Sequence, residues 1–169
     1  MLARRAAQAA PLLYLADATR SWASPDWIAQ EAQAVVKDGG PLLLIVDSVH
    51  AWVDSAPTAL SEYERLNLGL SSLRNLAQTL KCAILAVAER NRASMNAGGL
   101  SASAGSRKFE FGGESVLGLE RPKDTPPDGA GEVPIVLTIE KNRAGSPGRK
   151  IALRFHGALQ RFREAEGKA

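Results

Sequence analysis

The stretch from Leu42 to Ser48, Leu-Leu-Leu-Ile-Val-Asp-Ser, constrains the fold more than any other part of the sequence. A short, unbroken apolar run rich in branched residues is typical of a central parallel strand that is covered on both faces. Asp47 then lies at the carboxyl end of the strand, where open α/β sheets bind their ligands. A carboxylate fixed there can hold a hydrated Mg²⁺ beside nucleotide phosphates, although many buried strands end in Asp only to cap the following turn.

The residues before this strand predict a βαβ unit. An apolar strand is expected at residues 12–15. Residues 24–26, Ser-Pro-Asp, supply a Ser N-cap, a Pro at the first helical position and an acid in the first turn of a helix that runs through Val36. The order strand, helix, strand is that of a parallel sheet.

The residues after Asp47 predict a second strand beside the first. A polar connection at residues 54–58 precedes a helix from about Ser61 to Leu80, whose leucines recur at three- and four-residue spacing. The apolar run from Cys82 to Ala88 follows and ends at Glu89. Because the carboxyl ends of parallel strands meet at one edge of a sheet, Asp47 and Glu89 are expected to lie near each other.

The second half of the chain predicts a long loop and an antiparallel hairpin. Apart from Leu100, residues 93–106 consist of Ala, Ser, Gly, Asn and Met and carry no charge, which is the composition of a mobile loop. Strands are expected at residues 115–119, 134–140 and 149–155, and the last two form a hairpin. The intervening loop, residues 121–132, is interpreted as a surface connection without chemistry.

The hairpin region is strongly basic, since no acid occurs between Lys141 and Arg163. Lys141 and Arg143 lie at a strand end followed by glycines, so their charges are displayed on a turn. Fixed cations presented in this way suit a phosphate, Arg through its planar fork and Lys as a point charge. The alternative is a solvated turn that happens to be basic.

Composition fits a single α/β domain. A chain of 169 residues that is 45% hydrophobic can bury one core, expected over residues 1–163, with a frayed tail at residues 164–169. The net charge of +3 permits nucleic acid or nucleotide partners. The single cysteine, Cys82, excludes an internal disulfide and a Cys-based zinc site. No apolar stretch approaches the roughly 18 residues that span a bilayer, so no membrane association and a cytoplasmic location are expected.

Several of these segments together resemble the motor domain of DnaB-type replicative DNA helicases, a RecA-like ATPase. The matching segments are residues 42–48, 83–92, 109–117, 139–145 and 159–162. The most specific is Lys-Asn-Arg-Ala-Gly at residues 141–145, and the RadA-type repair ATPases share its Lys-Asn-Arg-x-Gly pattern. The resemblance covers residues 12–162. It implies a RecA-like α/β fold, a mainly parallel sheet flanked by helices with a carboxyl-terminal antiparallel hairpin, present as an incomplete core.

The resemblance also implies site residues. Asp47 matches the Walker B acid that holds Mg²⁺ beside ATP, and Lys141 and Arg143 match a Lys-x-Arg-x-Gly finger that reaches a nucleotide in the neighbouring subunit. Glu89 falls where the family has a glutamine that senses the γ-phosphate, and an acid there repels phosphate unless it is protonated or bridged by a metal. The implied DNA-binding residues are Gly105, Ser106, Arg107 and Lys108. Their loop lines the central channel in these helicases and grips single-stranded DNA through its phosphates.

The phosphate-binding loop of the family has no counterpart in this sequence. No Gly-x-x-x-x-Gly-Lys-Ser/Thr occurs, and the uncapped start at Met1 is interpreted as a domain cut after that loop. The resemblance therefore implies the carboxyl part of an ATP-dependent helicase motor that uses ATP and Mg²⁺, forms a homo-oligomeric ring, and is inactive without its P-loop part. The alternative is a degenerate module that binds single-stranded DNA or a helicase partner and hydrolyses nothing. A reading frame that continues upstream into a P-loop would favour the motor.

Overall fold

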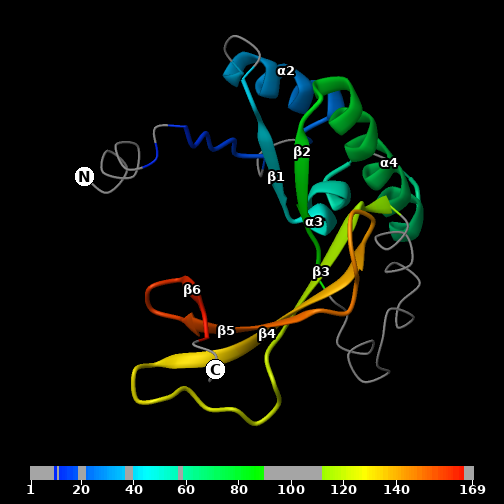
Figure 1. Ribbon diagram of the computed structural model, residues 1–169. Helices are drawn as coiled ribbons and strands as arrows, with labels where there is room; N and C mark the ends of the chain where they lie inside the picture. The colour runs from blue at the N-terminus through cyan, green and yellow to red at the C-terminus, as the bar shows by residue number, and fades with distance from the viewer. Residues whose placement is uncertain are drawn as a thin grey trace. The chain divides into compact units, whose positions relative to one another are not determined.

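The computed structural model describes residues 10, 12–18, 22–36, 40–56, 59–89 and 112–165. The chain divides into two compact units, residues 1–95 and 96–169, and Figure 1 shows helices and strands in the described residues of the first and the strands of an antiparallel sheet in those of the second. The single domain predicted over residues 1–163 stays a prediction. The tail predicted at residues 164–169 begins with Glu164, which is the last residue of a strand.

The described part of the first unit contains three helices, each of which begins after a serine N-cap. Helix α2 (Pro25–Val35) begins after Ser24, whose Oγ accepts a hydrogen bond from the Trp27 backbone N–H at 3.1 Å. Helix α4 (Glu62–Leu80) begins after Ser61, which forms a capping box with Glu64. Both helices confirm the sequence prediction. Helix α3 (Val49–Asp54), which follows β1 directly, was not predicted because six residues are too few to show a helical period.

Strands β1 (Leu43–Asp47) and β2 (Ala83–Val87) form a parallel pair, as predicted, with Asp47 opposite Val87. The expectation that β1 is covered on both faces is wrong for the described residues. The side chains of Leu43 and Ile45 are 56% and 52% exposed, whereas the other face is half-buried against the helices. Residues 12–15 form no strand, which corrects a second expectation, so the described sheet of this unit has two strands.

The core of the first unit lies among its helices. The buried hydrophobic residues are Ala23, Ile28, Ala32, Val49, Trp52, Val53, Leu66, Leu73 and Leu76. Trp52 is anchored at the centre by a hydrogen bond from its Nε1 to the Ala23 carbonyl oxygen at 2.7 Å, and its ring stacks on Trp22 at a centroid separation of 5.4 Å. Since α3 supplies Val49, Trp52 and Val53, this short helix fixes the chain immediately after Asp47.

The second unit is an antiparallel sheet in the order β3-β4-β5-β6. Its strands are β3 (Ser115–Glu120), β4 (Glu132–Asn142), β5 (Lys150–His156) and β6 (Arg161–Glu164). The hairpin of β4 and β5 confirms the sequence prediction, and β3 and β6 extend it at either edge. Strand β6 was not predicted as an element because its four residues are mostly charged.

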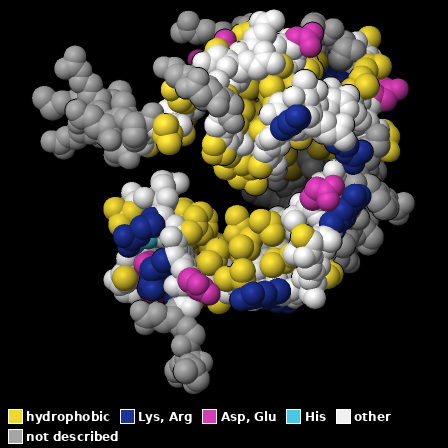
Figure 2. All heavy atoms as spheres, turned by 45° about the horizontal axis from the view of Figure 1, so that its top comes forward, with side chains coloured by type: hydrophobic (Ala, Val, Ile, Leu, Met, Phe, Trp, Pro, Cys, Tyr) yellow, Lys and Arg dark blue, Asp and Glu magenta, His cyan; other side chains and the backbone are white. Residues whose placement is uncertain are grey.

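The two faces of this sheet differ in polarity. Directly opposed residues of antiparallel strands share a face, and the register places one largely apolar set together. Its members are Leu117, Leu119, Val133, Ile135, Leu137, Ile139, Ile151, Leu153, Phe155 and Phe162, and Figure 2 shows hydrophobic side chains gathered over these strands. The other face carries the ion pairs Arg154–Asp128 and Arg163–Glu132. Within the described residues, no helix is both long and apolar enough to cross a membrane.

Candidate functional site

Asp47 and Glu89 lie at the same edge of the parallel pair, as the sequence predicts for two carboxyl ends. Asp47 is the last residue of β1 and is exposed, and Glu89 follows the end of β2 by two residues. The Glu89 backbone N–H donates to Nδ1 of His50 at 3.4 Å, so a side chain of α3 contacts the segment that leaves β2. The structure thus places both acids at the carboxyl edge of the parallel pair, which is where open α/β sheets bind ligands, and their roles stay predictions.

The first unit offers few ligands for a metal. In the parts of the chain that the structure describes, no three His, Cys, Asp or Glu side chains gather as a metal site. A single exposed carboxylate such as Asp47 fits an Mg²⁺ that keeps most of its waters and is shared with phosphates. Cys82 is a free, half-buried thiol, and burial raises its pKa, which disfavours the reactive thiolate.

The turn that carries Lys141 and Arg143 extends beyond the β4–β5 pairing. The last backbone bonds between the two strands join Ile139 to Arg149 and Gly148, at 2.9 and 2.7 Å. Beyond them β4 stays paired only with β3, with Lys141 opposite Val116 and Asn142 opposite Ser115. The position of this turn is therefore set by β3 rather than by its own hairpin partner.

An irregularity in β4 precedes the turn. Val116 pairs with Lys141 but Leu117 pairs with Ile139, so Glu140 is an extra residue in the strand. Such a bulge bends a strand and redirects the side chains that follow it. The turn closes at Gly148, whose φ of +86° lies in the region that favours glycine. Lys141 thus follows a local bend that the alternation of the sequence does not show.

Lys141 and Asn142 are held by residues that precede or begin β3. The Lys141 ammonium Nζ donates to the Gly113 carbonyl oxygen at 2.8 Å, and the Ser115 hydroxyl lies 3.3 Å from Asn142 Oδ1. The same oxygen accepts the Ala144 backbone N–H at 3.1 Å, which closes the turn locally. Lys141 is half-buried, so it is less exposed than the sequence predicts.

Arg143 is held by Glu114 in two ways. Its backbone N–H donates to the Glu114 carbonyl oxygen at 3.0 Å, and its Nη1 lies 3.4 Å from Glu114 Oε1. Gly113, Glu114 and Ser115, which we call the brace segment, therefore each contact one residue of the turn. Sequence reasoning assigned the turn but missed the brace segment, because the register that joins two distant stretches has no local signature.

The predicted DNA-binding residues, Gly105, Ser106, Arg107 and Lys108, lie outside the described residues. Their assignment stays a prediction.

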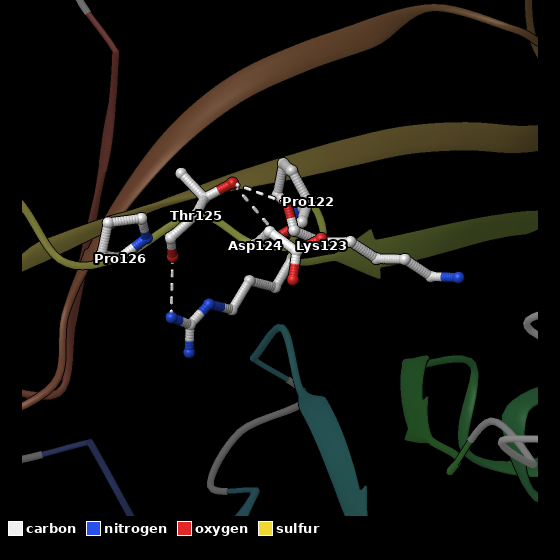
Figure 3. Close-up of a pocket in the computed structure, with 6 residues that line it drawn as sticks. Pro122, Lys123, Asp124, Thr125 and Pro126 are labelled. Atoms are coloured by element: carbon white, nitrogen blue, oxygen red, sulfur yellow. Dashed lines mark hydrogen bonds between the residues drawn. The ribbon is translucent and has the colours of Figure 1, made fainter.

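The loop between β3 and β4 is mostly exposed and ends at a charge cluster. An open hollow of about 470 Å³ is lined by residues 121–126 (Figure 3). The Arg121 guanidinium donates to the Thr125 carbonyl oxygen at 2.8 Å within that loop. The interpretation of this segment as a surface connection without chemistry stays a prediction. Glu132 is buried and accepts a bidentate pair from Arg163, which holds the pKa of its carboxyl below its usual value. The backbone N–H of Glu132 similarly lowers the pKa of Asp128.

These elements define an α/β protein with the fold of RecA-like helicase ATPase domains, present as an incomplete core. The solved structures that are similar to it include the following two. The first is described as the ATPase domain of G40P (TM-score 0.70, 18% identity, 85% of this chain and 52% of that chain). The second is a DnaB-like replicative helicase, described with its interactions with primase (TM-score 0.71, 18% identity, 85% of this chain and 36% of that chain).

The resemblance predicted from the sequence is confirmed at the level of the fold. The chain spans about half the length of the first of these structures and about a third of the second. No protein-family profile and no curated protein sequence matches it.

Proposed function

We propose that this chain is the carboxyl part of an ATP-dependent DNA helicase motor of the DnaB-like kind. In this proposal Asp47 contributes the Walker B contact to Mg²⁺, and Lys141 and Arg143 form a finger that acts on a nucleotide held by a neighbouring subunit. Glu89 lies beside the metal site, and Gly105, Ser106, Arg107 and Lys108 contact single-stranded DNA. The assembly is a homo-oligomeric ring.

The observation that carries the proposal is the support of the Lys141–Arg143 turn by β3. The turn lies past the end of the β4–β5 pairing, yet backbone and side-chain bonds fix it. The Arg143 side chain remains 57% exposed. A cation that is fixed at its base and exposed at its tip is suited to stabilise charge on a phosphoryl group of another subunit.

The proposal includes ATP and Mg²⁺ only where a P-loop part is supplied. The residues present fit an indirect contact to Mg²⁺ through Asp47, whereas the sequence contains no Gly-x-x-x-x-Gly-Lys-Ser/Thr to bind the phosphates. When bound, Mg²⁺ neutralises charge on the phosphates of ATP. The chain is therefore proposed to be inactive until a P-loop part is supplied.

Replacing the finger arginine tests the proposal. In a ring that contains this chain together with a P-loop part, Arg143→Ala should leave ATP binding nearly unchanged and lower hydrolysis by about 10³-fold, the scale of arginine fingers. Nucleotide binding and steady-state hydrolysis measure the two effects separately. Arg149→Ala, a basic residue beyond the turn, serves as the matched control and should retain hydrolysis.

Mixing two variants checks that the finger acts between subunits. Rings of Arg143→Ala and Asp47→Asn subunits should recover part of the activity, because some interfaces then pair an intact finger with an intact acid. Normal hydrolysis by Arg143→Ala alone would show that the finger assignment is wrong.

The second candidate is a module that binds single-stranded DNA or a helicase partner without hydrolysis. The lack of a phosphate-binding motif in this sequence favours it. It gains support if the chain binds single-stranded DNA while a supplied P-loop part restores no hydrolysis.

A further inference from the structure

We propose that the Glu114 carboxylate takes the place of a phosphate group beside the finger residue Arg143. This carboxylate pairs with the Arg143 guanidinium when no nucleotide is present. A polyphosphate anion displaces the carboxylate when the finger binds a nucleotide. This inference rests on the proposed function and adds the regulation of the same site.

The backbone of the turn does not depend on the Glu114 side chain. The Glu114 carbonyl oxygen holds the Arg143 N–H, the Gly113 carbonyl oxygen holds the Lys141 ammonium, and Val116 pairs with Lys141 in the β3–β4 register. Exchange of the carboxylate for an anion therefore requires movement of two side chains only. The turn itself stays in place.

The ion pair between Glu114 and Arg143 has the properties of an exchangeable contact. The two charged groups lie 3.4 Å apart, and their side chains are 79% and 57% exposed. Ion pairs between exposed side chains contribute little to stability. A polyphosphate offers more oxygen atoms to the planar guanidinium than one carboxylate does, and Lys141 lies two residues away to share the charge.

The same sheet contains an ion pair of the opposite character. Arg163 and Glu132 are joined by three contacts of 2.6 to 3.1 Å, and Glu132 is buried. That pair is built to persist, because loss of Arg163 would leave the buried Glu132 carboxylate without its partner. The Glu114–Arg143 pair is longer and more exposed than the Glu132–Arg163 pair. A pair with only a structural role would gain no stability from this distance and exposure, so the contrast supports a transient role for Glu114.

Pyrophosphate titration of the full chain tests the inference. The probe is the Arg143 Nε–Hε resonance in nuclear magnetic resonance spectra, identified by its loss in Arg143→Ala. Glu114→Gln should lower the half-saturating pyrophosphate concentration by about three- to fivefold, which is the scale of an exposed ion pair. Glu114→Asp, which keeps the charge, should stay close to the wild type.

Glu120→Gln is the matched control because it removes the same charge at the other end of β3. An equal gain in Glu120→Gln would assign the effect to net charge and overturn the inference. So would an unchanged or weaker affinity in Glu114→Gln, or an Arg143 resonance that pyrophosphate does not move. These outcomes are separate from the hydrolysis test, since Arg143→Ala can abolish hydrolysis whether or not Glu114 competes with the anion.

Discussion

Gly69 shows how closely two helices of the first unit approach each other. It lies on the buried face of α4, opposite the side chains of α3. A Cβ atom at this position would overlap Val53 Cγ1 and lie 3.3 Å from Trp52 Cζ3. Both neighbours are buried, so neither can move aside without disturbing the core.

Gly69→Ala should therefore destabilise the protein although alanine favours helices. Overpacking costs about 1 to 3 kcal/mol, whereas the gain in helix propensity is about 1 kcal/mol, so a net loss of up to about 2 kcal/mol in the free energy of unfolding is expected. Urea denaturation measures it. Gly129→Ala, which has no atom within 4 Å of the new Cβ, is the control and should be nearly neutral. A more stable Gly69→Ala variant would contradict this packing.

Single residues at strand ends were predictable from the sequence, whereas their partners were not. Asp47 and Glu89 are identified because each polar residue interrupts an apolar run, and the parallel register then places them at one edge. Glu114 shows no such pattern. Its contact with Arg143 joins residues 29 positions apart through the strand register, which local sequence does not encode.

At the level of elements, the ends of β4, β5 and β6 are held by charges. Glu132 at the start of β4 binds Arg163 of β6, and Asp128 pairs with Arg154 of β5. The Arg163 guanidinium is the main cause that lowers the pKa of Glu132 below its ordinary value of 4.5. A carboxyl whose pKa is lower in the folded than in the unfolded chain stabilises the fold above the unfolded pKa, and this contribution is lost as the pH falls through the folded pKa.

Glu132→Gln should reduce the stability of the second unit at neutral pH and flatten its dependence on pH. The wild type should lose stability as the pH falls below 4.5. The variant should lose less over the same range, and its remaining slope should come from Asp128 and, in the first unit, Glu64, since the pKa of each is also lowered. Thermal unfolding followed by far-ultraviolet circular dichroism at several pH values measures the difference. Glu164→Gln on β6 should keep the wild-type profile, and an equally steep loss in Glu132→Gln would contradict the role of the pair.

The elements that the sequence predicts well are the long or strongly patterned ones. Helix α4 has a leucine period and a capping box, and the β4–β5 hairpin has alternating strands around a glycine-rich turn. Helix α3 was missed because it is short. Residues 12–15 were predicted as a strand from their apolar composition, but a strand also needs a hydrogen-bonding partner, which the described structure does not give them.

At the scale of the whole molecule, both described units expose apolar strand faces. Leu43 and Ile45 are exposed on the parallel pair, and Leu117 and Leu119 are each 54% exposed on the apolar face of the β3–β6 sheet. Isolated exposed leucines are ordinary, but a contiguous apolar face is a surface that binds other apolar molecules.

The Leu117→Gln, Leu119→Gln double variant should bind less of a hydrophobic fluorescent dye than the wild type. The two leucines lie on one face of β3 beside Leu137 and Ile139, so their replacement interrupts a continuous patch. Dye titration measures the change. The Leu12→Gln, Leu15→Gln variant removes two leucines that are more exposed but lie outside the sheets, and it should change dye binding less. An equal effect of both pairs would show that the face is not a distinct surface.

The stack of Trp22 on Trp52 has a spectroscopic consequence. All three tryptophans and both tyrosines of the sequence, at positions 14, 22, 27, 52 and 63, fall in the first unit. Intrinsic fluorescence and near-ultraviolet dichroism therefore report on the helices around Trp52 and carry no tryptophan or tyrosine signal from the antiparallel sheet. Far-ultraviolet dichroism reports on both. The natural chromophores thus distinguish the melting of one unit from that of the other without any introduced label.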